Sequence, residues 1–496
     1  MASLETLKKG VRPLDKNIKD CIYMILENAN NFKDLEEEIY QLVCLIVREK
    51  IKEILKEVDD VLKESRNKEI FKNKDMKERT IKTLVGPITI KRRYYIDPEG
   101  NYHFLLDEYL NLPSNDRQSP GLKEAAIKIV KDESYRDSAE KVEELLGVSI
   151  SSSAIHNWVQ KLGKKIKKES QKKSHKLFNY GLIPGQSEKK TSIEHLFVEV
   201  DGIHIHLQNE EKKSGELKLG ISYEGWEKRH PMSKEYKLSQ KIYYGGVFES
   251  DRFWEQTTAD MYEYFKFSKD SISVLNGDGA SWVSSGSEYL PGFAARFLDS
   301  FHYSRKILKK LGRSSYVPRV FKAIEAGDKE SLIKDLQEAK NYRRKKKDKK
   351  KVEELKRYLL NHWEAIQNQH NKDLEIPVEI RGMGAIESNI DKVFANRFKK
   401  WGMRWSKEGA ENLAQIILAD RNNRLEKWFS CMNWEINQEK IQPKIKEAAS
   451  KNKERLTDGQ KETASYLKAL KAHMPALEGP DSGKNWVKGL RKIATI

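Results

Sequence analysis

Two apolar segments that each stop at an aspartate followed by glycine place the strongest constraint on this chain. Residues 196–201 read Leu-Phe-Val-Glu-Val-Asp, and residues 272–278 read Ile-Ser-Val-Leu-Asn-Gly-Asp. Aspartate is disfavoured inside a strand, and a buried carboxylate needs a partner or a metal ion. A single such aspartate is typical of a strand end that caps a turn. Two of them, each before a glycine that lets a ligand approach, favour a functional site.

The segments around these two strands alternate between strand and helix patterns. The first segment leads through Gly202 into Ile203–Leu207. Further strands are predicted at Glu216–Tyr223, Lys241–Phe248 and Ala295–Asp299, and helices at Arg252–Phe267, Ala280–Tyr289 and Phe301–Leu311. Three meandering strands, followed by helix, strand, helix and strand, are the order of a ribonuclease-H-like fold. The sequence therefore predicts a mixed α/β domain of this type, with the two aspartates at strand ends.

A third carboxylate follows a long helical stretch. Residues 381–397 begin glycine-rich and become helical, which places Glu387 in an early helical turn. Asp201, Asp278 and Glu387 offer the carboxylate oxygens that hard cations prefer, so we expect two Mg²⁺ (or Mn²⁺) ions there. Such a pair of ions activates the attacking oxygen and stabilises the leaving oxygen in phosphoryl transfer. His204 and His206 are interpreted as packing or substrate-side residues, because histidine is a poor ligand for Mg²⁺.

The excess of positive charge indicates a polyanionic partner. The chain has 93 Lys and Arg against 75 Asp and Glu, a net charge of +18. Most of the excess lies in two blocks, residues 161–176 and 343–351, each with eight basic residues and one acidic residue. Nucleic acid is the first expectation and an anionic membrane surface a distant second. Each block taken alone also fits a solvated helix face.

A helix-turn-helix outline lies directly before the first basic block. An amphipathic helix from Ser138 meets Gly147, and a serine-rich segment then opens a second helix. In a helix-turn-helix motif the second helix enters the major groove of DNA. The residues that would contact DNA from this helix are Ser152, Ser153, His156, Asn157, Lys164 and Lys165. The same outline also fits an ordinary helical hairpin.

A second candidate DNA-binding segment, residues 397–406, mixes four cations with two tryptophans. This composition suits phosphate neutralisation together with stacking on an unpaired base. The predicted contacts are Arg397, Lys399, Lys400, Trp401 and Arg404. Trp401 and Trp405 fit a role as core anchors equally well.

The remaining segments complete the predicted domain organisation. A helix is expected over about 34–65, and it packs on its own domain or pairs with a second copy of the chain. After it, Gly-Pro and Asp-Pro-x-Gly turns predict a small β-meander. Lys91, Arg92 and Arg93 crowd one strand of it, where they contact phosphate or are solvated. The predicted parts are an N-terminal helical region (1–75), the β-meander (76–118), a helix-turn-helix region (119–180), the first part of the catalytic domain (191–311), a helical insertion (312–379), the last part of the catalytic domain (380–425) and a C-terminal helical tail (426–496).

Several classes of protein are excluded at the level of sequence. No apolar run approaches the ~18 residues that span a bilayer, and the first residues lack the apolar core of a secretory signal. Cys21, Cys44 and Cys431 are isolated, so neither a disulfide framework nor a thiolate zinc site is expected. We expect a cytoplasmic, nucleoid-associated bacterial protein with no membrane partner.

Four motifs resemble the ISLre insertion-sequence transposases, which in turn resemble the Mutator-like DDE transposases. They are Val-Asp-Gly at Asp201, Gly-Asp-Gly-Ala-x-Trp at Asp278, Asp-Ser-Phe-His at residues 299–302 and Gly-Met-Gly-Ala-Ile-Glu-Ser at Glu387. The resemblance covers essentially the whole chain and implies that Asp201, Asp278 and Glu387 form a DDE triad. The last two lie 109 residues apart, which implies an all-helical insertion between them. Relatives often have Cys-x-x-His where this chain has Asp299 and His302, so the resemblance implies that His302 orients a DNA strand and leaves the role of Asp299 open.

The resemblance implies a transposase that cuts the ends of its element and joins the freed 3′-hydroxyl to target DNA. The implied partners are the terminal inverted repeats, the target DNA and a second copy of the chain, because both ends must be cut together. A homodimer or larger assembly is therefore expected. The alternatives are a metal-dependent nuclease or resolvase without strand transfer, a non-catalytic DNA-binding regulator, and a basic RNA-binding protein, for which no RNA-binding module is recognisable.

Overall fold

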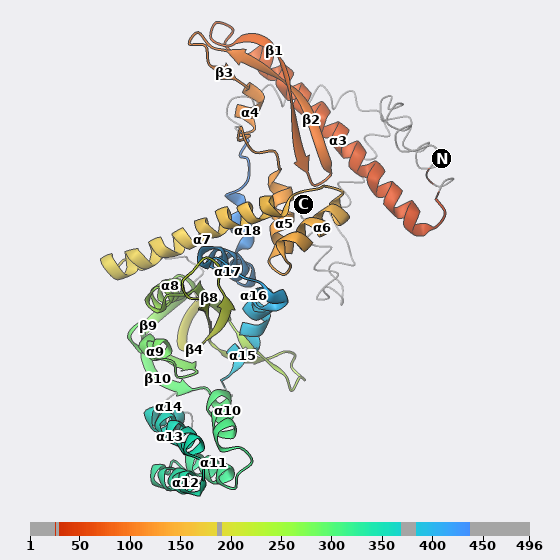
Figure 1. Cartoon of the computed structure of the whole chain (residues 1–496). Helices are drawn as coiled ribbons and strands as arrows, with labels where there is room; N and C mark the ends of the chain where they lie inside the picture. Colours follow the sequence, from red (N-terminus) through yellow and green to blue (C-terminus); the bar gives the residue numbers. More distant parts are fainter. Residues whose placement is uncertain (1–24, 26–28, 186–190, 369–382, 437–496) are drawn as a thin grey trace. The chain divides into compact units, whose positions relative to one another are not determined.

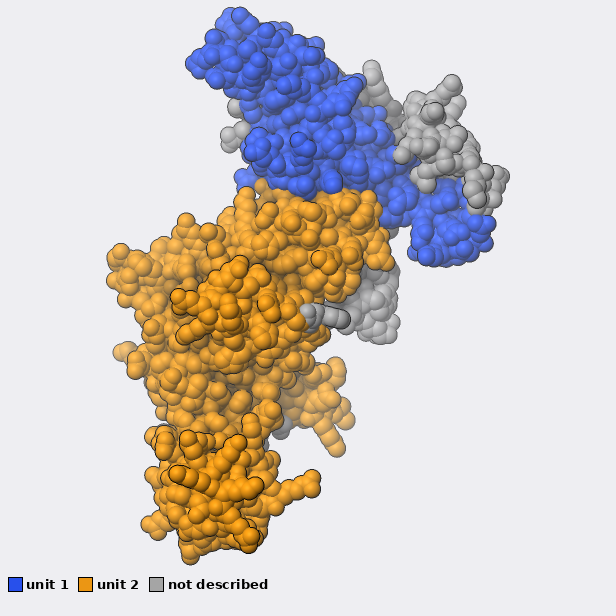
Figure 2. Space-filling model, in the orientation of Figure 1, with its two compact units in different colours: residues 1–118, 434–496 blue, residues 119–433 orange. Residues whose placement is uncertain are grey.

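The computed structural model describes residue 25 and residues 29–185, 191–368 and 383–436. The chain forms two compact units, residues 1–118 with 434–496 and residues 119–433 (Figure 2). Residues 186–190 and most of the predicted C-terminal tail lie outside the described residues. The finer division into domains stays a prediction. No described helix is both long and apolar enough to cross a membrane.

The first unit joins a long helix to a small antiparallel sheet. The helix α3 (Phe32–Ser65) begins after Asn31, whose side chain accepts the N–H of Asp34 at 3.0 Å. The sheet consists of β1 (Lys72–Thr83), β2 (Gly86–Ile96) and β3 (Tyr102–His103), and the short helix α4 (Leu105–Tyr109) follows. The predicted helix and antiparallel strands are both present, and β1 begins at Lys72, slightly before the predicted start of the β-meander at residue 76. Their shared core contains Leu62, Ile81, Ile88, Ile90, Leu106 and Leu112.

Two arginines of β2 form ion pairs inside the first unit. Arg92 Nε lies 2.7 Å from one carboxylate oxygen of Asp107, and Arg79 Nη1 lies 2.7 Å from the other. Arg93 Nη1 pairs with the buried carboxylate of Asp59, also at 2.7 Å. These guanidinium groups serve as internal counterions, so they are not the phosphate contacts considered from the sequence.

Three helices open the second unit. These are α5 (Pro120–Val130), α6 (Tyr135–Leu146) and α7 (Ser152–Tyr180). α6 ends at Gly147, whose φ of +63° lies in the left-handed region that favours glycine. α7 begins after Ser151, whose hydroxyl accepts the N–H of Ala154 at 3.2 Å. The predicted order of helix, glycine turn and capped helix is present, and α7 continues unbroken for 29 residues.

A mixed five-stranded sheet forms the centre of the second unit, in the order β10-β9-β4-β5-β8. β4 pairs with β9 in parallel and with β5 antiparallel, β10 pairs with β9 in parallel, and β8 pairs with β5 antiparallel. The strands are β4 (Thr191–His206), β5 (Ser214–Tyr223), β8 (Ile242–Val247), β9 (Phe265–Gly277) and β10 (Phe293–Leu298), and a separate ribbon joins β6 (Gly225–Lys228) to β7 (Tyr236–Ser239). The helices between and after them are α8 (Ser250–Tyr264), α9 (Ser281–Ser284), a 3₁₀ turn (Ser285–Glu288) and α10 (Ser300–Leu311).

The helix predicted over Arg252–Phe267 ends earlier than expected. α8 stops at Tyr264, and Phe265, Lys266 and Phe267 begin β9 instead. Their alternating apolar and polar side chains fit a strand, and they pair with the first residues of β4. A partner strand far away in the sequence therefore decides the conformation of this ambiguous segment.

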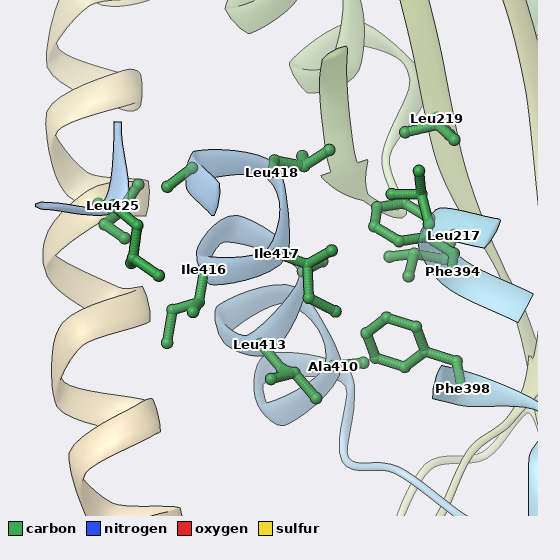
Figure 3. Close-up of a cluster of buried hydrophobic side chains, with 14 of the residues drawn as sticks. Leu217, Leu219, Phe394, Phe398, Ala410, Leu413, Ile416, Ile417, Leu418 and Leu425 are labelled. Atoms are coloured by element: carbon green, nitrogen blue, oxygen red, sulfur yellow. The ribbon is translucent and has the colours of Figure 1, made fainter. Parts of the chain in front are cut away.

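Helices cover both faces of the sheet. α8 and α9 pack on one face, through Phe253, Trp254 and Trp282. The other face is covered by α15 (Ala385–Ile390), a π-helical turn (Asp391–Ala395), α16 (Asn396–Phe398), α17 (Lys407–Arg421) and α18 (Leu425–Ser430). Figure 3 shows Ile417 and Leu418 of α17 directed towards Leu217 and Leu219 of β5, with α7 on the opposite side of α17. One hydrophobic core thus joins the helix-turn-helix region to the sheet.

The predicted helical insertion is helical throughout its described part, residues 312–368. It consists of α11 (Tyr316–Glu325), α12 (Lys329–Tyr342), α13 (Lys346–Asn361) and α14 (Trp363–Gln367) (Figure 1). Its core includes Leu332, Leu336 and Leu355, and it continues into Leu298 of β10 and Ile307 of α10. The insertion is therefore packed against the strand and helix that lead away from the edge of the sheet.

Candidate metal centre

Three aspartates lie at the edge of the central sheet where β9 and β10 end. Asp201 lies inside β4, which continues to His206, so the prediction that it stands at a strand end is wrong. The parallel pairing of β4 with β9 ends at Glu199 and Asn276, so extending the register by two residues places Asp201 beside Asp278. On the other side of β9, Leu298 pairs with Gly277, and Asp299 donates its backbone N–H to the carbonyl of Gly277 at 2.9 Å. Because neighbouring strands lie ~4.8 Å apart, the sheet presents these aspartates in a row.

Asp201, His302 and Glu387 converge at this edge, from β4, α10 and α15 respectively. One ligand atom from each of the three residues lies within 4.8 Å of the other two. His302 Nε2 is 3.6 Å from Glu387 Oε2 and 4.0 Å from Asp299 Oδ2. Among the described residues, this is the group of acidic and histidine side chains that could hold a metal ion.

Asp278 lies next to this group, but its side chain hydrogen-bonds to the backbone of the turn that follows it. Its Oδ1 accepts the N–H of Ala280 at 2.9 Å. Its backbone carbonyl accepts the hydroxyl of Tyr358, from α13 of the insertion, at 3.2 Å. Lys306 Nζ lies 3.4 Å from the centre of the Tyr358 ring. The structure thus brings Asp201, Glu387 and His302 together, whereas the Asp278 carboxylate is outside this group.

The charge of Asp201 is disfavoured where it stands. Burial raises the pKa of Asp201 from 3.8 to about 6, and the charges of Asp278 and Glu387 add to the rise. The Gly202 N–H, which Asp201 Oδ1 accepts at 2.7 Å, and the nearby His302 act in the opposite direction. A cation placed beside such a buried carboxylate stabilises its charged form and lowers its pKa.

Asp299 gives the site a second carboxylate that is short of partners. Its side chain is 1% exposed, and its Oδ1 caps α10 by accepting the N–H of Phe301 at 2.9 Å. Its Oδ2 is buried without a hydrogen-bond partner, and burial raises the pKa of Asp299. Carboxylate oxygens in this condition fit a divalent cation, with His302 as a nitrogen ligand or a donor to a bound group.

Sequence reasoning missed Glu199, which lies on β4 beneath Asp201. Its side chain is completely buried, and burial raises the pKa of Glu199. It accepts hydrogen bonds from the hydroxyl of Tyr223 at 2.5 Å and from the N–H of Ile386 at 3.2 Å. The available signal was a glutamate inside the apolar run Phe-Val-Glu-Val, where a charged residue needs a reason.

The exposed side of α7 carries a line of lysines. Six of them are exposed along one side of the helix and form what we call the α7 lysine ridge: Lys161, Lys164, Lys165, Lys168, Lys172 and Lys176. Lys167 and Lys173 point inward instead, to Glu411 at 3.2 Å and to Glu263 at 2.6 Å. His156 and Asn157 are exposed near the start of α7, and Ser152 is half-buried.

The residues of the second predicted DNA-binding segment, 397–406, differ in their exposure. Lys399, Lys400 and Arg404 are exposed, whereas Trp405 is a buried core residue. The side chain of Trp401 lies outside what the structure describes.

Arg397 requires a correction, because it is 4% exposed. Its Nε donates to the carbonyl of Val130 at 3.0 Å, and its guanidinium lies 4.9 Å from the centre of the Trp405 ring. The structure contradicts the prediction that Arg397 contacts DNA, since its guanidinium is enclosed by α5 and the Trp405 ring.

Comparison with known sequences identifies relatives over most of the chain. The family model described as "Uncharacterised protein family (UPF0236)" matches residues 25–429. A UPF0236 protein of Caldanaerobacter subterraneus subsp. tengcongensis is 28% identical over 440 residues, which are 86% of this chain and 87% of that protein. A UPF0236 protein from the vanSb 3′ region of Streptococcus gallolyticus is 27% identical over 411 residues, with 82% and 86% covered.

Comparison with solved structures finds the strand transfer complex of the Drosophila P element transposase. The match covers 75% of this chain and 90% of that chain, with 8% sequence identity and a TM-score of 0.21. A TM-score this low carries no conclusion about fold or function.

Proposed function

We propose that this chain, which belongs to the uncharacterised protein family UPF0236, is the DNA transposase of an insertion sequence. It would cut the ends of its element and join the freed 3′-hydroxyl to target DNA by phosphoryl transfer. The observation that carries the proposal is the convergence of Asp201, Glu387 and His302, with Asp278 on the adjacent strand, at one edge of the sheet.

The catalytic fold that we propose is ribonuclease-H-like. The second unit has the order of elements expected for this fold, namely β4, β5 and β8, then α8, β9, α9, β10 and α10. Asp201 lies on the central strand β4, Asp278 directly follows the neighbouring strand β9, and the helical insertion separates Asp278 from Glu387 in the sequence. This arrangement supports assignment of the three carboxylates as a DDE triad.

The residues of the site have separate proposed tasks. Asp201, Asp278 and Glu387 would hold two Mg²⁺ or Mn²⁺ ions, and Asp278 would have to exchange its contact with the Ala280 N–H for the metal. When bound, such ions polarise the scissile phosphate and the attacking and leaving oxygens. His302, between Glu387 and Asp299, would donate its ring N–H to a phosphate oxygen of the DNA strand and so orient it.

DNA binding is assigned to cationic and polar surfaces of the second unit. The α7 lysine ridge would contact phosphates, while His156 and Asn157 at the start of α7 would reach base edges. Lys399, Lys400 and Arg404 are exposed and would add phosphate contacts. Because α7 packs into the same core as the sheet, DNA held by α7 stays at a fixed place relative to the carboxylates.

The names of the relatives agree with a mobile element. The name of one Caldanaerobacter relative joins eleven locus designations, and that of another joins four. A protein encoded at many places in one genome is what repeated transposition produces.

The test uses the purified full-length chain and DNA that carries the sequences flanking its own reading frame. We expect nicking at the element ends with Mg²⁺ or Mn²⁺, followed by joining of the 3′ end to a second DNA. Asp201→Asn and Glu387→Gln should abolish both steps and retain binding in a gel-shift assay. Asp270→Asn, an exposed aspartate of the same unit, is the matched control and should keep full activity.

Other outcomes separate the alternative functions. Nicking without joining would replace the proposal with a nuclease or resolvase. Binding to the ends without any cleavage, in both metals, would favour a DNA-binding regulator. Equal cleavage by Asp201→Asn would exclude the assigned triad.

A further inference from the structure

Glu199 is a buried carboxylate that the proposed chemistry does not use. It lies two residues before Asp201 on β4, so both side chains point to the same face of the sheet. Asp201 reaches the edge where the metal ligands gather, whereas Glu199 is 0% exposed in the layer between the sheet and α15. A carboxylate in such a place is unfavourable unless hydrogen bonds satisfy it, so its partners indicate what it is for.

The partners of Glu199 come from a strand and a helix. The hydroxyl of Tyr223, on β5, donates to Glu199 Oε1 at 2.5 Å. The backbone N–H of Ile386, in the first turn of α15, donates to Glu199 Oε2 at 3.2 Å. Tyr223 thus sets the direction of the carboxylate, and the carboxylate holds the start of α15.

The start of α15 has no local substitute for this contact. Gly384 occupies the N-cap position and has no side chain with which to accept a first-turn N–H. Glu199 therefore does from β4 what a capping serine or aspartate does in other helices. The residue after Ile386 is Glu387, so this contact fixes the point from which Glu387 extends towards Asp201 and His302.

We propose that Glu199, oriented by Tyr223, is a positioning residue that sets the distance between Glu387 and Asp201 and thereby the affinity of the site for divalent cations. The inference rests on the proposed function, because it assumes that Asp201 and Glu387 bind metal. Removing a residue that hydrogen-bonds to or orients a metal ligand commonly lowers metal affinity or activity by about 10- to 100-fold. We expect an effect of this order for Glu199.

The test measures binding of Mn²⁺ to the full-length chain without DNA, by titration calorimetry and by the loss of the free-ion paramagnetic resonance signal. Glu199→Ala should weaken binding by about 10- to 100-fold. Glu199→Gln should remain close to the unsubstituted protein, because its amide oxygen still accepts the Ile386 N–H and its NH₂ can donate to Tyr223. Tyr223→Phe should fall between the two, since the carboxylate remains but loses its orienting donor.

The matched control is Ser222→Ala on β5. Ser222 is fully buried and its hydroxyl lies 2.7 Å from that of Tyr244, on the face of the sheet away from α15. Loss of this contact should lower the thermal unfolding midpoint and leave Mn²⁺ affinity unchanged. A general effect of destabilising the sheet would instead weaken metal binding in this variant too, and would overturn the inference.

Further outcomes keep the inference separate from the proposed function. Wild-type Mn²⁺ affinity in Glu199→Ala, or equal losses in Glu199→Ala and Glu199→Gln, would overturn it. If Glu199→Ala does not fold, unchanged affinity in Tyr223→Phe would do so. If the chain binds Mn²⁺ in the predicted order of variants but never cuts DNA, the positioning role stands and the proposed transposase function fails.

Discussion

Replacing Asp201 by asparagine should stabilise the protein at neutral pH, although it should abolish the proposed activity. The reason is the pKa of Asp201, which burial raises from 3.8 to about 6. A carboxyl group with a raised native pKa favours the folded state when it is protonated. Its contribution to stability is therefore fully present below pH 3.8 and is lost as the pH rises through about 6. Asparagine keeps the shape of the side chain and removes the charge.

The size of the effect follows from the two pKa values. A rise from 3.8 to about 6, at about 1.4 kcal/mol for each pH unit, corresponds to about 3 kcal/mol at pH 7.5. Small movements of Asp201 and entry of water relieve part of this penalty, so we expect a gain of about 1–3 kcal/mol. At pH 4 the native Asp201 is protonated and the gain should nearly vanish.

The assay is urea unfolding of the full-length chain in chelator-treated buffer, at pH 4.0 and at pH 7.5. The control is again Asp270→Asn, which should change stability at neither pH. Added Mg²⁺ should stabilise the unsubstituted protein at pH 7.5, because it binds the folded site, and should stabilise Asp201→Asn much less.

Two results would refute this reasoning. A gain of the same size at both pH values would show that the ionisation of Asp201 is not its cause. The absence of any gain at pH 7.5 would show that the folded protein holds this charge without penalty, which conflicts with its burial between other carboxylates.

Three further perturbations test particular features of the structure. Arg397→Met should lower the free energy of unfolding, because it removes the hydrogen bond from the guanidinium to the Val130 carbonyl. Arg404→Ala should instead weaken DNA binding and leave stability unchanged. The reverse pattern would identify Arg397 as a DNA contact. Changing the exposed Lys345, Lys346 and Lys347 to glutamine should weaken DNA binding and reduce the slope of log affinity against log salt by up to about 3; an unchanged slope would identify these lysines as solvated. Gly163→Ala should destabilise the second unit by about 1–3 kcal/mol in urea unfolding, because an added Cβ would lie 2.1 Å from the carbonyl oxygen of Asn412; wild-type stability would show that α7 and α17 are not so closely packed.

Local patterns predicted the elements that carry the site. The alternation of apolar side chains identified β4 and β5, and Gly147 with its following serines identified the start of α7. Such signals depend on neighbours within a few residues, so a single sequence reveals them. The boundary between α8 and β9 was predicted wrongly, because Phe265–Phe267 is strand only by pairing with β4.

Burial was the property that the sequence could not supply. Arg397 and Lys399 belong to the same basic segment, yet one is enclosed and the other is exposed. Glu199 and Asp201 stand on the same face of the same strand, yet Glu199 is fully buried under α15. The two residues of each pair carry the same charge and lie close together in the sequence, so only the packing of distant helices determines which of them is buried.

The sequence by itself determined which carboxylates are candidates, because an aspartate that interrupts an apolar strand conflicts with local preference wherever the chain folds. It also determined where cations concentrate and, through Gly147 and the serines after it, where α6 ends and α7 begins. Only the tertiary structure decided that Asp201, His302 and Glu387 meet while the Asp278 carboxylate turns to its own loop. The physical reason is that distances, burial and the resulting pKa of Asp201 depend on parallel pairing and helix packing between segments far apart in the chain.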